Sequence, residues 1–362
     1  MDGRPESDGR VLRPAGFDEL SGWADDDHGA ALAAFRRGAA VLATQPPKAR
    51  SLGLDAGALA TAIRTADALP SDISAEAARD FFEREFAPAL VTAEAFFTGY
   101  YEPEVEGSRV RTGEFSVPLY RAPDDLVEIE PGAVQGLDAS FRFARRSGTG
   151  FTEHPDRGAI MAGALNGREL ELVYLRDPVD AFFIQVQGAA RVSLTDGTLM
   201  RVTYAAKSGH PYTAIGKVLI DVGALAPGTV TMQAIRGWLT AHPDEAPAVM
   251  TKNRSFIFFR EAPVADGDAG PIAAAKVPLT AGRSLAVDRL GHTFHAPVFI
   301  ETTLPDGRAW RRLMIAQDTG SAIVGPARGD IFFGSGDAAG EIAGAMRGGG
   351  RFFVLLPKGG GP

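Results

Sequence analysis

The segment best suited to chemistry is the run 316–325, AQDTGSAIVG. A strand predicted for Leu313 to Ala316 delivers Asp318 at its end, and Gly320 allows the tight turn that follows. Because apolar residues flank it, the Asp318 carboxyl should be partly desolvated, which raises a carboxyl's pKa and lets it hold a proton near neutral pH. The segment therefore predicts a general acid. The alternative interpretation is an Asx-turn, in which the carboxylate only caps backbone amides.

Other acids lie near this segment. Asp330 and Asp337 follow within twenty residues, and Asp288 ends the apolar run LAVD. Each acid taken alone is more often a loop cap. Four acids at strand ends of one region could form a site, because glycoside cleavage commonly employs one or two carboxyls.

Three polar segments earlier in the chain are candidate ligand contacts. The run TGYYEP (98–103) places two aromatic residues and an acid beside a turn, and exposed tyrosines can stack on sugar rings. Gln185 and Gln187 alternate with Val186 in a strand predicted for 182–187, so both should face one side. The run KSGHPY (207–212) is a polar loop with an aromatic residue. The alternative for each segment is a solvated strand edge or turn.

The elements that must position these residues change along the chain. Apolar residues at helical spacing predict three helices in the first ninety residues: Leu32 to Leu42, Leu59 to Ala66, and Ala78 to Phe86 behind the cap Ser74. One more helix is predicted near Met232 to Leu239, and a small one near Gly340 to Met346. Asp196-Gly197 and Pro305-Asp306-Gly307 predict hairpins. The last third predicts six strands: 256–259, 285–287, 298–300, 313–316, 331–333 and 352–356. The expected fold is mostly β with N-terminal helices.

Composition excludes several functions. The 362 residues carry a net charge of −8, which argues against a nucleic-acid partner and offers no basic face for an anionic membrane. The chain has no cysteine, so no disulfide, thiol nucleophile or acylated cysteine is expected. The six histidines lack metal-ligand spacing, and no phosphate loop is present, so neither a metal nor a cofactor is expected. No apolar run approaches the length of a membrane span, and MDGRPESDGR lacks the apolar core of a signal peptide.

Taken together and in order, these segments resemble the membrane-bound lytic murein transglycosylase A family over roughly four-fifths of the chain. The segments that carry the resemblance are FFER (81–84), TGYYEP (98–103), PLY (118–120), DPVDAFF (177–183), QVQG (185–188), GHPY (209–212), NRSF (253–256), VPLT (277–280), RSLAVD (283–288) and QDTG (317–320).

The resemblance implies a fold of two β-domains. A double-psi β-barrel would be formed by residues 1–103 and 242–362, with a 3D module at about 255–358 named for three aspartates, here Asp288, Asp318 and Asp330. An inserted β-domain, 104–241, would line a glycan groove between the two.

It also implies a function. The family cleaves the bond between N-acetylmuramic acid and N-acetylglucosamine in peptidoglycan and leaves a 1,6-anhydro end. Asp318 matches the family's single acid/base, and Asp330 and Asp337 would support it. The implied substrate contacts are Tyr100, Tyr101, Glu102, Gln185, Gln187, Ser208, His210, Tyr212 and Asp288. The expected partners are glycan strands and cell-wall synthesis proteins, at the periplasm or the outer membrane.

The chain departs from the family at several points. Gly188-Ala189-Ala190-Arg191 stands where the family usually has Gly-Ser-Gly-Arg, and Ser208 stands where asparagine is frequent. These changes affect details of substrate contact. The usual lipoprotein signal and its cysteine are missing, so we expect either a trimmed or misassigned start or a soluble periplasmic member.

Three other functions stay open at this stage. Asp318-Thr319-Gly320-Ser321 resembles the turn of aspartic peptidases, but these use two aspartates, and without a second such turn a dimer would be required. A non-catalytic glycan-binding module and a hydrolase with two carboxyls and a water are the others. Analysis of the muropeptide products separates all of them.

Overall fold

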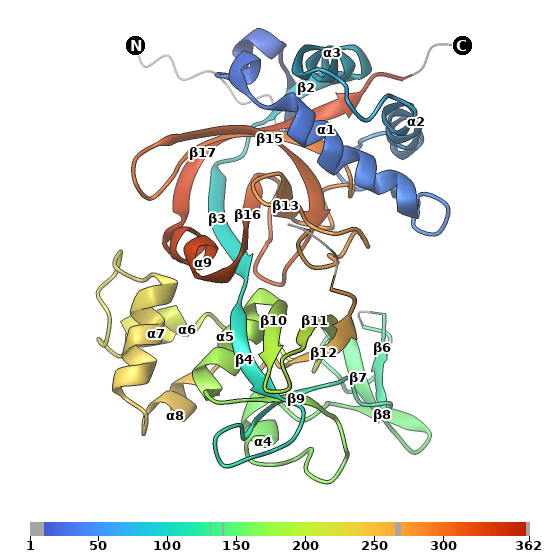
Figure 1. The fold of residues 1–362 in the computed structure, drawn as a ribbon. Coiled ribbons are helices and arrows are strands. Elements are labelled where there is room, and N and C mark those ends of the chain that lie inside the picture. The colour runs from blue at the N-terminus through green and yellow to red at the C-terminus, as the bar shows by residue number, and fades with distance from the viewer. Residues whose placement is uncertain (1–10, 131, 140, 265–268, 360–362) are drawn as a thin grey trace, which may run out of the picture. The chain divides into compact units, whose positions relative to one another are not determined.

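The computed structural model describes residues 11–130, 132–139, 141–264 and 269–359 (Figure 1). Residues 1–10, where the sequence predicts no signal peptide, lie outside the described residues. The chain divides into two compact units. Unit 1 comprises Met1–Tyr100, Gly267–Gly334 and Met346–Pro362, and unit 2 comprises Tyr101–Asp266 and Ser335–Ala345.

Six strands of unit 1 close into a ring. The strands are hydrogen-bonded in the order β17 (Arg347–Pro357), β14 (Pro297–Thr303), β15 (Ala309–Asp318), β13 (Ser284–Val287), β16 (Arg328–Ser335) and β3 (Ala95–Glu102), and β3 pairs back with β17. β13 and β15 are parallel, whereas β14 is antiparallel to both β15 and β17. β2 (Phe86–Val91) and β1 (Leu12–Pro14) extend the sheet from β17. The closed sheet confirms the mostly-β prediction and agrees with a barrel.

The predicted N-terminal helices are present and lie together beside the closed sheet (Figure 1). They are α1 (His28–Arg36), α2 (Ala56–Asp67) and α3 (Ala75–Glu85), with short 3-10 turns at Phe17–Glu19, Trp23–Asp25 and Arg37–Val41. The predicted cap Ser74 accepts a hydrogen bond from the Ala77 amide. Phe35 and Phe82 are fully buried in one core with Phe299 and Phe353 from the sheet, so the helices belong to this unit's core.

Unit 2 contains a sheet in the order β12 (Ile257–Ala262), β11 (Leu199–Lys207), β10 (Ala189–Leu194), β4 (Glu104–Ser108), β9 (Glu171–Leu175) and β5 (Val117–Tyr120). A second sheet is formed by β6 (Leu126–Glu128), β7 (Phe143–Ser147) and β8 (Gly150–Thr152). Its helices are α4 (Arg157–Met161), α5 (Pro178–Gln187), α6 (Ile215–Asp221), α7 (Met232–Ala241), α8 (Ala246–Met250) and α9 (Gly336–Ala345). The predicted Asp196-Gly197 turn joins β10 to β11, with Gly197 at φ 84°.

The strand predicted for 182–187 is wrong, because these residues form most of α5. Asp177 accepts a hydrogen bond from the Val179 amide, Pro178 occupies the first turn, and Gly188 ends the helix at φ 83°. Phe182, Phe183 and Ile184 are buried in succession. Burial on several sides of a helix removes the polar stripe that identifies a surface helix, and the run then looks like a strand.

Units 1 and 2 also differ from the predicted domains in three segments, 101–103, 242–266 and 335–345. All three were assigned to the barrel and all lie in unit 2. β12 is hydrogen-bonded to β11 along its length, and the Gln233 amide of α7 donates to the Gly340 carbonyl of α9 at 3.2 Å. Strand pairing of β12 and a side-chain hydrogen bond to α9 thus link the two longer segments to unit 2.

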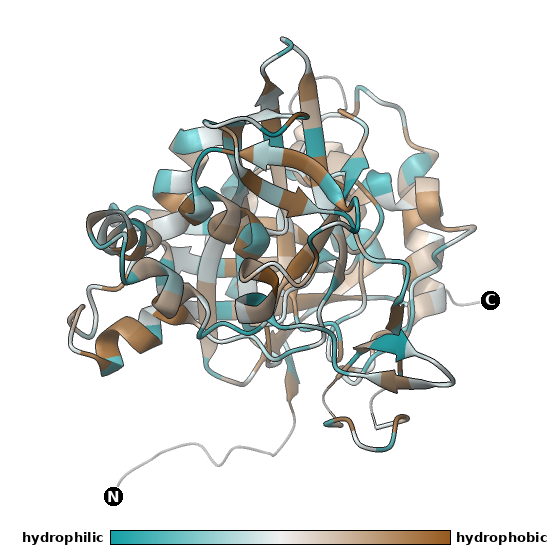
Figure 2. Ribbon diagram, turned by 90° about the horizontal axis from the view of Figure 1, so that it is seen from below, coloured by the Kyte–Doolittle hydropathy of each residue, from teal (hydrophilic) through white to brown (hydrophobic). Residues whose placement is uncertain are grey.

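Hydropathy follows this architecture. In Figure 2 apolar residues recur along the strands, and polar residues are frequent in the connecting loops. Within the described residues, no helix has both the length and the apolar character needed to cross a membrane.

The aromatic core of unit 1 can be tested by truncation. Phe82 is fully buried and its ring lies 5.8 Å from that of Phe35. Phe82→Ala should lower the free energy of unfolding by about 3–5 kcal/mol, because the lost contacts leave a cavity. Urea denaturation followed by circular dichroism measures this. The control Phe151→Ala, at a side chain that is 40% exposed, should change it by less than about 1 kcal/mol. Equal effects would contradict this packing.

Candidate functional site

Asp318 lies at the end of β15, and its neighbour Gln317 holds that end in place. Gln317 is fully buried. Its carbonyl oxygen accepts a hydrogen bond from the Ser284 hydroxyl at 2.6 Å, and its amide donates to the Ala34 carbonyl of α1 at 2.9 Å. The strand end is therefore tied to both β13 and α1, which leaves the Asp318 backbone little freedom.

The Asp318 carboxyl is surrounded by hydrogen-bond donors. The Tyr100 hydroxyl donates to one oxygen at 3.0 Å, the Ala274 amide donates to the other at 3.1 Å, and the Thr319 amide also donates. Burial raises the pKa of Asp318, and these donors together with the charge of Lys276 only partly offset that rise. The backbone amides match part of the Asx-turn interpretation. The raised pKa is the property that a general acid needs.

The strand register brings Asp330 to the same place. Ala286 of β13 is the register partner of Asp318 on one side, after an irregularity in the pairing between Leu285 and Ala286, and of Asp330 on the other. Both acids therefore lie opposite the same residue of β13. Burial raises the pKa of Asp330, and the charge of Asp318 raises it further. The two carboxyls therefore interact.

Asp330 has its own support. The Thr98 hydroxyl donates a short hydrogen bond to the Asp330 carboxylate, and the Arg328 guanidinium donates to the Thr98 oxygen at 2.6 Å. Thr98 and Tyr100 are two residues apart on β3, so they point to one face of that strand. One strand thus supplies a hydroxyl to each of the two carboxyls.

A cluster of apolar residues lies next to the two carboxyls. Tyr100 is 9% exposed, and its ring lies 5.3 Å from that of Phe332. Burial, and next the charge of Asp318, raises the pKa of Tyr100 well above its ordinary value, so the phenol stays a donor. The other buried members of this apolar cluster are Leu279, Ala286 and Ile323.

The other two acids are placed differently. The Asp288 carboxylate accepts from the Leu290 amide at 2.9 Å and from the Gly325 amide at 2.8 Å. These bonds tie two loops together, as in the loop-cap interpretation. Asp337 is exposed in the first turn of α9 and belongs to unit 2, whereas Asp318 and Asp330 belong to unit 1.

Glu102 is fully buried in an ion-pair cluster of unit 2. Its carboxylate lies 2.7 Å from Nε of Arg201 and 3.1 Å from Nε of Arg191, and it accepts from the Ser335 hydroxyl at 2.7 Å. The Arg201 side chain is only 1% exposed. These contacts are those of a structural carboxylate.

Gln185 and Gln187 do not share a face, because they lie on the helix α5 and not on a strand. Residues two apart on a helix point in nearly opposite directions. Gln187 accepts a hydrogen bond from the Tyr101 amide at 3.1 Å. Gln185 is buried, and its side-chain carbonyl meets no hydrogen-bond partner among the described residues.

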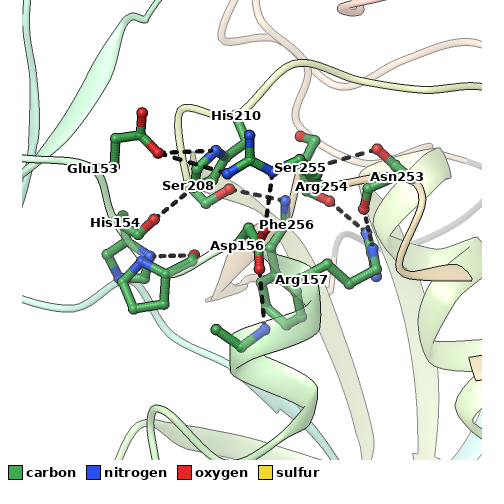
Figure 3. A network of polar contacts seen from close by, with 12 residues as sticks. Glu153, His154, Asp156, Arg157, Ser208, His210, Asn253, Arg254, Ser255 and Phe256 are labelled. Carbon is green, nitrogen blue, oxygen red and sulfur yellow. Dashed lines mark hydrogen bonds and ion pairs between the residues drawn. The ribbon is translucent and has the colours of Figure 1, made fainter. Parts of the chain in front are cut away.

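A network of polar contacts supports the GHPY loop (Figure 3). The Ser208 hydroxyl accepts from the Phe256 amide at 3.1 Å, and Nε2 of His210 lies 2.6 Å from the His154 carbonyl oxygen. Ser208 and His210 are buried, whereas Tyr212 is 37% exposed. Of the three predicted contacts in this loop, Tyr212 has the accessible ring.

Several parts of the site were missed from sequence. Thr98 and the Ala274 amide donate to the carboxyls and Arg328 donates to Thr98, yet Thr98 was named only as part of the run TGYYEP and the other two were not singled out. Thr98 stands two residues before Tyr100, a spacing that could have suggested it. Ala274 lies in a turn and Arg328 on β16, each far in sequence from its partner, so local patterns do not identify them.

Comparisons with known proteins identify the family. Family models match residues 96–260 as the MltA specific insert domain and 283–356 as the 3D domain. The crystal structure of the membrane-bound lytic murein transglycosylase from Agrobacterium tumefaciens is 46% identical, with a TM-score of 0.89 over 96% of this chain and 98% of that one. The chain belongs to the membrane-bound lytic murein transglycosylase A family.

Two further members of the family bear on function. Escherichia coli MltA with bound chitohexaose is 27% identical, with a TM-score of 0.68 over 98% of this chain and 93% of that one. The curated membrane-bound lytic murein transglycosylase A of Escherichia coli K12 is 35% identical over 268 residues. That match spans 72% of this chain but only 65% of the length of the relative.

The role of Glu102 can be tested by neutralising it. Glu102→Gln leaves two arginines facing a neutral group in a buried site, so it should lower the free energy of unfolding by about 3–5 kcal/mol. Its control is Glu104→Gln, whose side chain is 47% exposed and also contacts Arg191, and which should lose less than about 1 kcal/mol. Chemical denaturation measures both. If Glu102→Gln were as stable as the parent chain and only weakened glycan binding, Glu102 would be a substrate contact.

Proposed function

We propose that this chain is a peptidoglycan lytic transglycosylase in which Asp318 serves as both acid and base. The observation that carries the proposal is the Asp318 carboxyl itself. Burial raises its pKa, and three donors are in place to stabilise the carboxylate once the proton has left. A group that loses and regains one proton needs both properties.

In the first step Asp318 gives its proton to the oxygen of the glycosidic bond between N-acetylmuramic acid and N-acetylglucosamine. The C1–O bond breaks with its electron pair on that oxygen, and positive charge develops at C1. The Asp318 carboxylate that remains is stabilised by the Tyr100 hydroxyl and the Ala274 amide.

In the second step the C6 hydroxyl of the same muramic acid attacks C1 and passes its proton to Asp318. A 1,6-anhydro ring forms, no water is consumed, and the carboxyl returns to its starting state. Because the nucleophile belongs to the substrate, positioning of the sugar supplies much of the rate.

We assign Asp330 a supporting role. When it is ionised, its charge opposes ionisation of Asp318 and favours positive charge at C1. The hydroxyl of Thr98 and, through it, the guanidinium of Arg328 support the charged form. Asp337 stays a proposed supporting residue of unit 2.

We further propose that unit 1 is the catalytic domain and that unit 2 contributes glycan contacts, with the partly exposed Tyr212 as the strongest candidate. The chitohexaose bound to the Escherichia coli relative supports a glycan substrate. Peptidoglycan lies outside the cytoplasm, so we place the activity in the cell envelope, in the periplasm or at the outer membrane. Cell-wall synthesis proteins are the proposed partners.

The contacts of the carboxyls do not favour an aspartic peptidase. Such an enzyme needs two carboxyls that share a proton directly. Here the hydrogen bonds of Asp318 go to Tyr100 and Ala274 and that of Asp330 goes to Thr98, and among the described residues none joins the two carboxyls.

Asp318→Asn tests the proposal directly. It should lower turnover of purified peptidoglycan by at least about 10²–10⁴-fold while glycan binding stays near that of the parent chain, because only the transferable proton is lost. Mass spectrometry of the products should show 1,6-anhydro-muropeptides, which are one water lighter than hydrolytic products. Asp288→Asn is the matched control and should keep its activity. The turnover of Asp330→Asn should lie between those of Asp318→Asn and Asp288→Asn. Products with free reducing ends would indicate a hydrolase, and binding without cleavage would indicate a glycan-binding module.

The hydrogen bond from Tyr100 predicts a shift in the pH profile. This bond lowers the pKa of Asp318, so Tyr100→Phe should raise that pKa. Asp318 must be protonated for the first step, and the alkaline limb of kcat/KM should therefore move to higher pH. Tyr101→Phe is the control, since Tyr101 lies in unit 2 and makes no contact with Asp318 among those described. An alkaline limb that stays in place or moves to lower pH in Tyr100→Phe would argue against Asp318 as the acid.

A further inference from the structure

Unit 1 contains a cavity of about 590 Å³ that the proposed reaction does not use. Its lining comes from three segments: 22–30, 280–283 and 304–312. Trp310 lies eight residues before Asp318 on β15, which corresponds to about 25 Å along a strand. A cavity of this volume is in the range of small-molecule sites.

The arginines that line the cavity differ in their partners. Arg283 is buried and donates two hydrogen bonds to Asp26 at 2.8 and 2.9 Å, and Arg308 pairs with Asp306 at 2.6 Å. Arg312 makes no hydrogen bond or ion pair with any described residue. Its guanidinium lies 4.2 Å from the ring of Trp310. Stacking on the indole holds the guanidinium in one orientation and leaves its N–H edge for an acceptor.

Two further polar groups in the lining also have no partner. The Thr280 hydroxyl oxygen and the Trp310 indole nitrogen are both buried, and neither meets a hydrogen-bond partner among the described residues. Buried polar groups are nearly always paired, and an unpaired one costs about 1–3 kcal/mol. Both residues line the cavity, so a bound molecule with acceptors could pair with these groups after a small side-chain adjustment.

Carboxylates line the cavity as well. Asp27 accepts from the Ala30 amide as the cap of α1, but the exposed Asp25 carboxylate has no partner within the described part of the chain. With Arg283 and Arg308 already paired, Asp25 and Asp27 remain as negative groups and Arg311 and Arg312 as positive ones, and the charges of Asp26 and Asp27 act on Arg312 without an ion pair to it. A ligand with a carboxylate and an ammonium group would complement both.

We propose that this cavity binds a short peptide with a free carboxylate and a free ammonium group, the carboxylate on Arg312 and the ammonium near Asp25. The choice of a peptide rests on the proposed function, because the stems of peptidoglycan carry both groups. An uncharged glycan would bring no charged group to Arg312 or to Asp25. A carboxylate can accept two parallel hydrogen bonds from a guanidinium, the arrangement that arginine favours.

The test measures binding without catalysis. The probe is L-alanyl-γ-D-glutamyl-meso-diaminopimelic acid, titrated into the full chain by calorimetry and by NMR of the three tryptophan indole N–H signals. We expect saturable binding that shifts the Trp310 signal, which Trp310→Phe identifies. Arg312→Gln should weaken binding at least about tenfold, because a charge-assisted bond is lost. Thr280→Val should weaken it several-fold, and chitohexaose should not compete.

The control is Arg64→Gln, an exposed arginine on α2 outside the cavity, which should bind the tripeptide like the parent chain. If Arg312→Gln is poorly folded, Arg312→Lys replaces it. This variant keeps the positive charge but lacks the planar guanidinium, so it should still bind the tripeptide more weakly than the parent chain does. Absence of saturable binding by the parent chain, or unchanged binding by Arg312→Gln, would overturn the proposal. Cleavage of peptide-free glycan strands, assayed in parallel, reports on the reaction alone, so the two proposals fail separately.

Discussion

The pairing of β13 with two neighbouring strands is the constraint on which the site depends. Ala286 pairs with Asp318 in parallel and with Asp330 antiparallel, so one short buried strand sets the position of both carboxyls. The pairing with β15 shifts by one residue between Leu285 and Ala286, and this irregularity brings Asp318 instead of Gln317 opposite Ala286. The raised pKa of each carboxyl comes from burial beside this strand, so their acidity depends on the register as much as their position does.

The N-terminal helices secure that register from outside the sheet. Gln317, next to Asp318, donates to the Ala34 carbonyl of α1. Nearer the middle of β15, the buried Asp26 carboxylate accepts from Arg283 and from the Leu313 amide at 2.7 Å. The first forty residues therefore hold β15 and the segment before β13 at two points. Three parts of the chain that are distant in sequence therefore meet around the strand end that carries Asp318, and the N-terminal helices are part of what holds it.

Local signals and the family resemblance predicted much of this fold and three residues of the candidate site, Asp318, Asp330 and Tyr100. Caps and turns depend on a few neighbouring residues, so the Ser74 cap and the Asp196-Gly197 hairpin were predicted correctly. Asp318 was found in the same way, from a carboxyl in an apolar run. Thr98 and Arg328 were missed because their contacts depend on strand order, which local patterns do not encode. The helix α5 was missed because burial on several sides removed its periodicity.

The resemblance to a family identifies residues that matter without saying what each one does. Glu102, Ser208 and His210 were all expected to contact substrate, yet each is buried and bonded within unit 2. Arg157 shows how such residues act. It is buried, donates to the Asn253 and Ser255 carbonyls, and lies 4.7 Å from the ring of Phe182, with its pKa lowered to about 10 by burial. A guanidinium that contacts backbone carbonyls and aromatic rings, and has no carboxylate partner, holds the backbone in place. In this unit a family motif can therefore consist of several residues that hold a loop and one, Tyr212, left accessible to a ligand.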